Sequence, residues 1–155
     1  MKLTPEYLAG FFDGEGCIDC QTMYAKPPYE KRFYVRPRIR LAQGPSGFMV
    51  LDELKREFGG HVSKERQGRG NQSNSKSWEI LNKKGIIAML ELLEPLLVIK
   101  QEQARLCLWW FKHCAGKNGL PEAARKKFAE QLKLMKRDPQ RLSGEAIAQI
   151  ERLMR

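Results

Sequence analysis

Two glycines four residues apart in a short helical stretch constrain the fold of this chain more than any other feature. The stretch begins at Thr4 and Pro5, a favourable start because the threonine hydroxyl can cap a helix and the first turn does not need the N–H that proline lacks. Gly10 and Gly14 then fall on one helix face. Because each glycine costs a helix about 1 kcal/mol relative to alanine, we expect another backbone to pack closely against that face.

Asp13 and Glu15 stand at the end of the same helix, where the helix dipole disfavours negative charge. A bound cation would stabilise carboxylates placed there. The alternative is an ordinary amphipathic N-terminal helix that ends at a Gly-x-Gly cap, residues 14–16. The short stretch alone leaves both readings open, because motifs of this length recur by chance.

The composition favours a polyanionic partner. The chain of 155 residues has 28 Lys and Arg against 18 Asp and Glu, a net charge of +10. Nucleic acid is the first candidate for such an excess and an anionic membrane surface the second. No apolar run reaches the length of a membrane span, and the N-terminus lacks a signal-peptide pattern. We therefore expect a soluble intracellular protein without a membrane partner, in an organelle (chloroplast or mitochondrion) or in a bacterial or phage-infected cytoplasm.

The four cysteines are Cys17, Cys20, Cys107 and Cys114. The spacing of the first two is that of a metal site, but no second CxxC or histidine pair completes a zinc centre. The other two share one face of an apolar helix, as core cysteines do. We predict that all four are reduced and structural.

A strand with regular alternation is predicted at residues 34–41. Its apolar face carries Val35, Pro37, Ile39 and Leu41, and its other face carries Tyr34, Arg36, Arg38 and Arg40. A merely solvated face is one interpretation, but three arginines would repel one another there. A DNA groove suits them better, because arginine pairs with guanine in a major groove wide enough for a two-stranded ribbon. Since proline cannot donate to a ladder, we expect an unpaired edge or a bulge at Pro37.

The remaining elements alternate in kind. We predict a strand at 17–23, a loop at 24–33, a helix at 48–58 ended by Gly59 and Gly60, a strand at 61–67, a hairpin tip at 68–77, a strand at 76–81, helices at 85–93 and 100–114, and two closing helices, one opened by Pro121 and one capped by Ser143. We expect Met49, Leu51, Leu54 and Phe58 of the second helix in the core, with Trp78 and Ile80 inward and Ser77 and Glu79 outward. This order predicts an α+β fold of one domain, residues 1–155, with a core at about 4–114 and a helical extension at about 120–155.

Residues 8–16 (Leu-Ala-Gly-Phe-Phe-Asp-Gly-Glu-Gly) resemble the nine-residue signature of the LAGLIDADG homing endonucleases. Glu15 takes the second acidic position, where the family accepts Asp or Glu. The likeness extends to the order of elements over residues 4–114, and Lys100 matches a family lysine that precedes a Gln-Ala helix. The resemblance implies an αββαββα core with an antiparallel DNA-binding sheet and additional C-terminal helices.

The same resemblance implies metal-dependent double-strand DNA cleavage at a long, near-palindromic site. Glu15 and the carbonyl of Gly14 would bind Mg²⁺, for which Mn²⁺ or Ca²⁺ can substitute in binding. Gln43 would order the water network, and Lys100 would stabilise the developing charge. Some relatives carry a further basic residue just after the glutamine, whereas residues 44–47 are uncharged here. No small-molecule substrate is implied.

Because the signature occurs once, the resemblance implies a homodimer as well as a DNA partner. The expected interface residues are Tyr7, Leu8, Gly10, Phe11 and Gly14. The expected DNA contacts are Asp19, Gln21, Met23, Lys26, Lys31, Arg32, Tyr34, Arg36, Arg38, Arg40, Ser63, Arg66, Arg69, Ser77 and Glu79. Two rivals remain open: a DNA-binding regulator that does not cleave, and an RNA-splicing maturase on the same fold.

Overall fold

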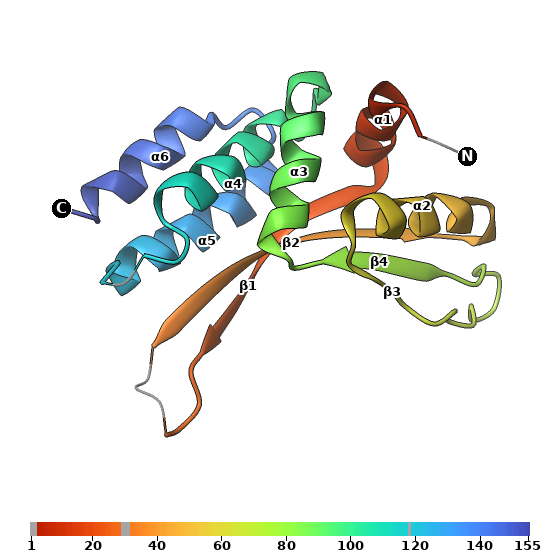
Figure 1. Cartoon of the computed structure of the whole chain (residues 1–155), viewed down its shortest axis with the longest axis horizontal. Helices are drawn as coiled ribbons and strands as arrows, with labels where there is room; N and C mark the ends of the chain where they lie inside the picture. The colour runs from red at the N-terminus through yellow and green to blue at the C-terminus, as the bar shows by residue number, and fades with distance from the viewer. Residues whose placement is uncertain (1–2, 29–31, 118) are drawn as a thin grey trace. The chain divides into compact units, whose positions relative to one another are not determined.

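The structure of the chain is a computed structural model that describes residues 3–28, 32–117 and 119–155 (Figure 1). The chain forms two compact units: residues 1–17 and 38–98 make the first, and residues 18–37 and 99–155 make the second. Strands β1 (Gly16–Tyr24), β2 (Phe33–Gln43), β4 (Lys76–Ile80) and β3 (His61–Val62) are hydrogen-bonded in that order. The predicted α+β class is confirmed, with β4 antiparallel to both β2 and β3.

Helix α1 (Pro5–Glu15) begins as the sequence predicts, because the Thr4 hydroxyl accepts a hydrogen bond of 3.2 Å from the backbone N–H of Tyr7. Leu8, Ala9 and Phe12 are buried on its inner face. This face packs against α3 (Lys83–Leu93) and the short 3-10 helix η2 (Glu94–Leu96) in the first unit. The glycines lie on the opposite, exposed side of the helix.

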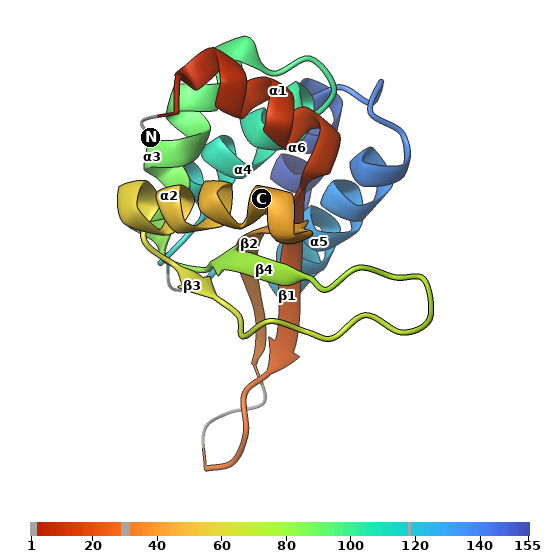
Figure 2. The same cartoon turned by 90° about the vertical axis from the view of Figure 1, so that its right-hand side faces the viewer.

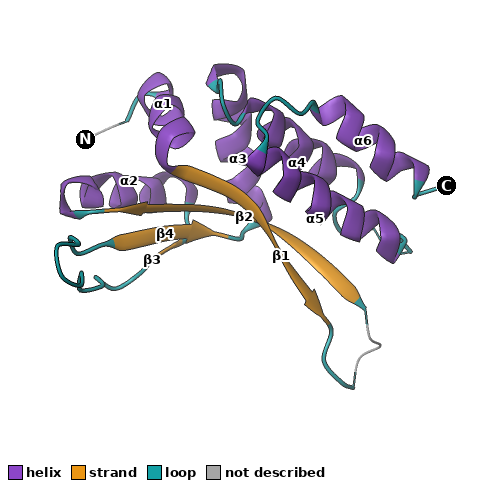
Figure 3. Ribbon diagram, turned by 180° about the vertical axis from the view of Figure 1, so that it is seen from behind, coloured by secondary structure: helices purple, strands orange, loops and turns teal. Residues whose placement is uncertain are grey.

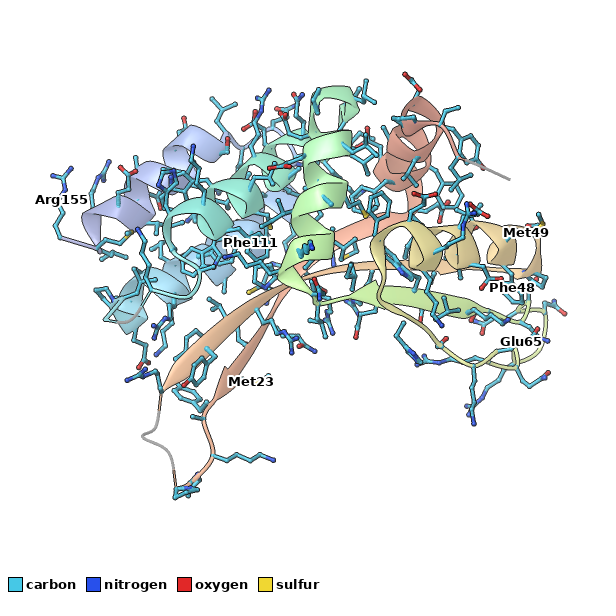
Figure 4. The ribbon with its side chains drawn as sticks, in the orientation of Figure 1. Met23, Phe48, Met49, Glu65, Phe111 and Arg155 are labelled. Carbon is cyan, nitrogen blue, oxygen red and sulfur yellow. The ribbon has the colours of Figure 1, made fainter. Side chains whose placement is uncertain are left out.

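Helix α2 (Phe48–Phe58) packs on strands β3 and β4 in the first unit, as Figure 3 shows. It buries Val50, Leu51 and Leu54. The prediction that Met49 joins the core is wrong, since 64% of this residue is exposed. Met49 precedes Leu51 by two residues, which is about 200° around a helix, so it faces away from the core (Figure 4).

The inner face of β2, β4 and β3 is organised around Trp78, which is fully buried. Leu41 on β2 and Val62 on β3 flank it in register. Its indole N–H donates to the carbonyl of Gly59, 2.9 Å away, immediately after α2. Gly59 thus ends the helix and also accepts the hydrogen bond from the only polar group of the Trp78 side chain.

Strand β3 is shorter than the predicted 61–67. It comprises His61 and Val62, followed by an isolated bridge between Arg66 and Ser75. At the next pair the Ser63 N–H still donates to the Ser77 carbonyl at 2.8 Å, but the Ser77 N–H donates to the Ser63 hydroxyl, 3.0 Å away, in place of a backbone carbonyl. Figure 2 shows the β3–β4 connection extending beyond the strands as an open loop.

Helices α4 (Gln101–His113), α5 (Glu122–Arg137) and α6 (Ser143–Arg152) pack on one another in the second unit. The Trp110 and Phe128 rings stack in their core, with centroids 4.2 Å apart. The predicted cap of α6 is wrong: Ser143 is the first helical residue, and its N–H donates to the Glu102 carboxylate at 2.7 Å. Burial raises the pKa of Glu102, but hydrogen bonds from Ser143 and the ion pair with Arg105 outweigh it and hold this pKa below its usual value.

All four cysteines are free thiols. Burial raises the pKa of Cys107, and it raises that of Cys114 to about 11, so these two are poor nucleophiles at neutral pH. Among the described residues, no three His, Cys, Asp or Glu side chains group closely enough to hold a metal. Within those same ranges, no helix has the length and apolarity that a membrane crossing requires.

We predict that Gly60→Ala destabilises the protein. Gly60 has φ +89°, and a Cβ there would lie 2.5 Å from the Glu79 carbonyl oxygen. Backbone strain of this kind costs about 1–3 kcal/mol, which equilibrium unfolding in urea would detect. Gly144→Ala is the matched control, because a Cβ at Gly144 meets no atom within 4 Å. Equal unfolding free energies for the two variants would contradict the prediction.

Candidate functional site

Glu15 is the last residue of α1, and its side chain is exposed. Gly14, beside it, is also exposed, and a Cβ placed there would meet no atom within 4 Å. Carbonyls in the last turn of a helix lack intrahelical partners, apart from that of Phe12, which accepts the N–H of Gly16. This end of α1 therefore offers a carboxylate and backbone oxygens, the donors that Mg²⁺ and Ca²⁺ prefer. The residues present fit a divalent cation whose other ligands are water or phosphate oxygens.

The two acids of α1 differ in what they contact. Asp13 accepts a hydrogen bond of 2.7 Å from the backbone N–H of Val98, within the first unit. A charge-assisted bond of this kind offsets the unfavourable helix dipole. Asp13 therefore stabilises the helix end and ties it to the segment after η2. Glu15 is left as the acid that faces outward.

Gln43 ends β2 and lies opposite Lys76 of β4 in register. Its side-chain amide donates to the carbonyl of Ala42 at 2.8 Å. The side chain folds against Gly47 of the 3-10 turn η1 (Pro45–Gly47): a Cβ at Gly47 would lie 2.5 Å from the Gln43 side-chain oxygen. Lys76 is itself held over the Phe48 ring, with Nζ 4.6 Å from the centroid. The Gln43 side chain therefore packs closely against the uncharged turn at Gly47.

Lys100 occupies the N-cap position of α4, one residue before the helix begins, and is half-buried. It belongs to the second unit, whereas Glu15 and Gln43 belong to the first. The joint action of these three residues stays a prediction.

In the first unit, the outer face of the sheet carries the polar residues that the sequence assigns to DNA contact. Arg38 and Arg40 of β2 alternate with the buried Ile39 and Leu41. Glu79 lies opposite Arg40 in register, and Ser77 lies opposite Ala42. Arg66 and Arg69 are exposed in the β3–β4 connection, and Ser63 is half-buried at its start. The predicted alternation of β2 and β4 is therefore confirmed, while contact with DNA stays a prediction.

The pairing of β2 with β4 begins at Ile39, so Pro37 lies beyond it. Its missing N–H therefore breaks no hydrogen bond to β4, and the unpaired edge or bulge expected at Pro37 stays a prediction.

In the second unit, β1 and the first half of β2 carry the other predicted DNA contacts. Lys26, Arg32, Tyr34 and Arg36 are exposed, Met23 is about half exposed, and Asp19 and Gln21 are half-buried. Lys31 lies outside the described residues. Asp19 also lines a cavity of about 390 Å³ with Lys133 and Lys136 of α5.

Sequence reasoning missed two residues that hold this hairpin to α5. The Arg125 guanidinium donates to the carbonyl of Phe33 at 3.3 Å. Lys126 Nζ lies 5.5 Å from the Phe33 ring centroid and 5.9 Å from that of Tyr24, and the two rings meet edge-on, 5.3 Å apart. No local pattern signals these contacts, because basic residues on an amphipathic helix are ordinarily solvated.

The exposed face of α1 carries the residues expected at a dimer interface. Tyr7 is half exposed and stacks on Phe11, with centroids 6.0 Å apart. A Cβ on Gly10, as on Gly14, would meet no atom within 4 Å. Leu8 is different: only 4% of it is exposed, because it points into the core of its own chain. We therefore leave Leu8 out of the proposed interface.

Two comparisons with known proteins agree on one family. The family model described as LAGLIDADG endonuclease matches residues 8–109. The DNA endonuclease I-CvuI of Chlorella vulgaris is 28% identical over 103 residues, which cover 66% of this chain and 60% of that protein's length.

Solved structures show the same fold. The crystal structure of I-CvuI in complex with its target, in the presence of 2 mM Ca, has a TM-score of 0.70 at 23% identity and covers 96% of this chain and 93% of that one. The archaeal intron-encoded homing endonuclease I-Vdi141I, complexed with DNA, has a TM-score of 0.66 at 16% identity, covering 96% of this chain and 95% of that chain. The expected homing-endonuclease-like fold is confirmed.

We predict that Gly47→Ala displaces the Gln43 side chain. The added Cβ would lie within 2.8 Å of Gln43 side-chain atoms, and overpacking of this kind costs about 1–3 kcal/mol. The measurements are urea unfolding and the NMR signals of the Gln43 side-chain amide. Gly44→Ala is the control in the same turn, since its nearest contact would be 3.8 Å. If Gly47→Ala changes neither measurement more than Gly44→Ala does, the close packing of Gln43 against Gly47 is wrong.

Proposed function

Because this chain belongs to the LAGLIDADG endonuclease family, we propose that it is a site-specific endonuclease that cuts double-stranded DNA with a divalent metal, Mg²⁺. The observation that carries the proposal is the exposed Glu15 carboxylate at the end of α1, where backbone oxygens accompany it and Asp13 is already engaged by Val98.

Glu15 and the carbonyl of Gly14 would hold the ion, and Mn²⁺ or Ca²⁺ would substitute in binding. When bound, a divalent ion supplies Lewis-acid stabilisation of negative charge on a phosphate and a more acidic water. Gln43 would turn its amide from the Ala42 carbonyl to orient that water. The Lys100 ammonium would balance the charge that develops on the phosphate as the P–O bond breaks.

The outer face of β2 and β4 would meet the DNA. Arginine side chains suit guanine edges in the major groove, while basic side chains elsewhere would neutralise phosphates. The net charge of +10 supports such a partner, because every neutralised phosphate releases counterions.

A second copy of the chain would complete the assembly. The open face of Tyr7, Gly10, Phe11 and Gly14 lets another α1 approach closely, and twofold symmetry would present two sheet faces to a near-palindromic site. A non-cleaving regulator has no need of an outward carboxylate, which repels phosphate unless a cation lies between them. No observation favours an RNA-splicing role over cleavage.

Glu15→Gln tests the proposed chemistry. The variant keeps the shape and loses the charge, so we expect Mg²⁺-dependent double-strand cleavage of a selected site to fall about 100-fold or more. Binding without metal should persist or tighten. Lys100→Met should also lose cleavage with little loss of binding. Glu6→Gln, at the exposed start of the same helix, is the charge-matched control. A wild-type protein that binds its site tightly yet never cuts it in Mg²⁺ or Mn²⁺ would be the regulator.

Gly10→Leu tests the dimer. Within one chain the leucine would meet open space, so the fold should survive. Two copies of α1 would clash, and because each leucine costs about 1–3 kcal/mol by overpacking, the dimer should weaken at least about 30-fold. Sedimentation equilibrium measures this, with Gly144→Leu as the surface control. An unchanged dimer affinity would remove α1 from the interface.

A further inference from the structure

The outer sheet face of the first unit contains one acid among its basic residues. Glu79 lies on β4, directly opposite Arg40 of β2 and His61 of β3. Its carboxylate contacts the guanidinium of Arg38, the diagonal neighbour, with 3.3 Å between Nη1 and Oε2. Both residues belong to the first unit and flank the buried Ile39, Trp78 and Ile80 on the alternate face.

Stability does not explain this ion pair. The Arg38 side chain is 18% exposed and that of Glu79 is 36% exposed, so water screens the attraction and the pair adds little to folding. Phosphate affinity does not explain it either. A carboxylate in the middle of a basic face repels a polyanion and weakens every backbone contact nearby.

The geometry gives the acid a different use. A guanidinium is a planar fork with five N–H donors, so the same group can bond a carboxylate and a base edge through different donors. Held in one orientation, an arginine loses less conformational freedom when it pairs with the O6 and N7 acceptors of guanine. The carboxylate also disfavours a phosphate in the same place, so the arginine is directed to a base edge rather than to the backbone.

We propose that Glu79 is a positioning residue that fixes Arg38 for the reading of one base pair in each half-site and keeps it off the phosphates. Arg38 is then a base-reading arginine whose selectivity depends on an acid two positions away across the sheet. The inference rests on the proposed function, because it requires that this face meets duplex DNA.

The test compares Glu79→Ala with wild-type protein in a binding selection from a randomised DNA library, followed by affinity measurements at several salt concentrations. We expect the preference at one position per half-site to fall about fivefold or more, the lower range of what one bidentate contact discriminates. Without a carboxylate beside it to repel phosphate, Arg38 should contact the DNA backbone more often, so the slope of log affinity against log salt should steepen by up to about 0.9 per protomer.

The matched control is Glu91→Gln, which removes one negative charge from the exposed surface of α3. It should leave both the base preference and the salt slope unchanged. Glu79→Gln, which keeps the size of the side chain, repeats the test if Glu79→Ala unfolds. A double-mutant cycle then asks whether Glu79 acts through Arg38: in an Arg38→Ala background, Glu79→Ala should change the preference no further.

The outcomes separate cleanly. If the wild-type protein selects no sequence at all, the proposed function fails, and this inference fails with it. If the wild-type protein selects a site and Glu79→Ala selects it equally well, this inference alone is wrong. If Glu79→Ala loses preference equally with or without Arg38, then Glu79 reads a base by itself, and the positioning role is wrong.

Discussion

The alternation of β2 is the constraint on which the rest of this molecule depends. Every second residue of the strand from Pro37 to Leu41 is buried, and the residues between them are arginines. Because side chains alternate strictly along a strand, a slip of one residue in the pairing with β4 would bring Arg38 and Arg40 into the core. Burial of Ile39 and Leu41 around Trp78 therefore fixes the register and, with it, the positions of the charged side chains. The same packing energy that folds the sheet sets the spacing of the surface proposed to read DNA.

Helix α1 divides its roles in a similar way. Its inner face is buried, and its outer face holds two glycines with open space around them. At its end, one acid is bonded to the Val98 N–H and the next is exposed. Two carboxylates two residues apart thus meet different electrostatic conditions, since one accepts a backbone N–H and the other is exposed to solvent.

Local patterns predicted most of the elements, because capping, period-two alternation and glycine stops are encoded within a few residues. Thr4 caps α1, α2 runs from Phe48 to Phe58, and Trp78 and Ile80 face inward, all as the sequence indicates. The Met49 error is local, since its angular position on α2 faces away from the core, but two other errors share a different cause: a partner distant in sequence decides the outcome. Where β3 ends, the Ser77 N–H bonds the Ser63 hydroxyl rather than a carbonyl, and the N–H of Ser143, which was expected to cap its own helix, bonds Glu102. The candidate site was predictable only residue by residue, since neither the Arg38–Glu79 pair nor the Gly47 contact with Gln43 leaves a trace in any local pattern.

The contacts of α5 with the β1–β2 hairpin have a consequence for the proposed reading of DNA. Arg125 bonds the backbone of Phe33, and Lys126 lies over the rings of Tyr24 and Phe33 at the loop end of the hairpin. The orientation of the hairpin therefore depends on a helix whose Arg125 lies 92 residues after Phe33 in the chain. A library of variants that changes only hairpin residues would leave this orientation unchanged, so its members would present different side chains in the same geometry. A library that also varies Arg125 and Lys126 would change the orientation of the hairpin as well as its side chains.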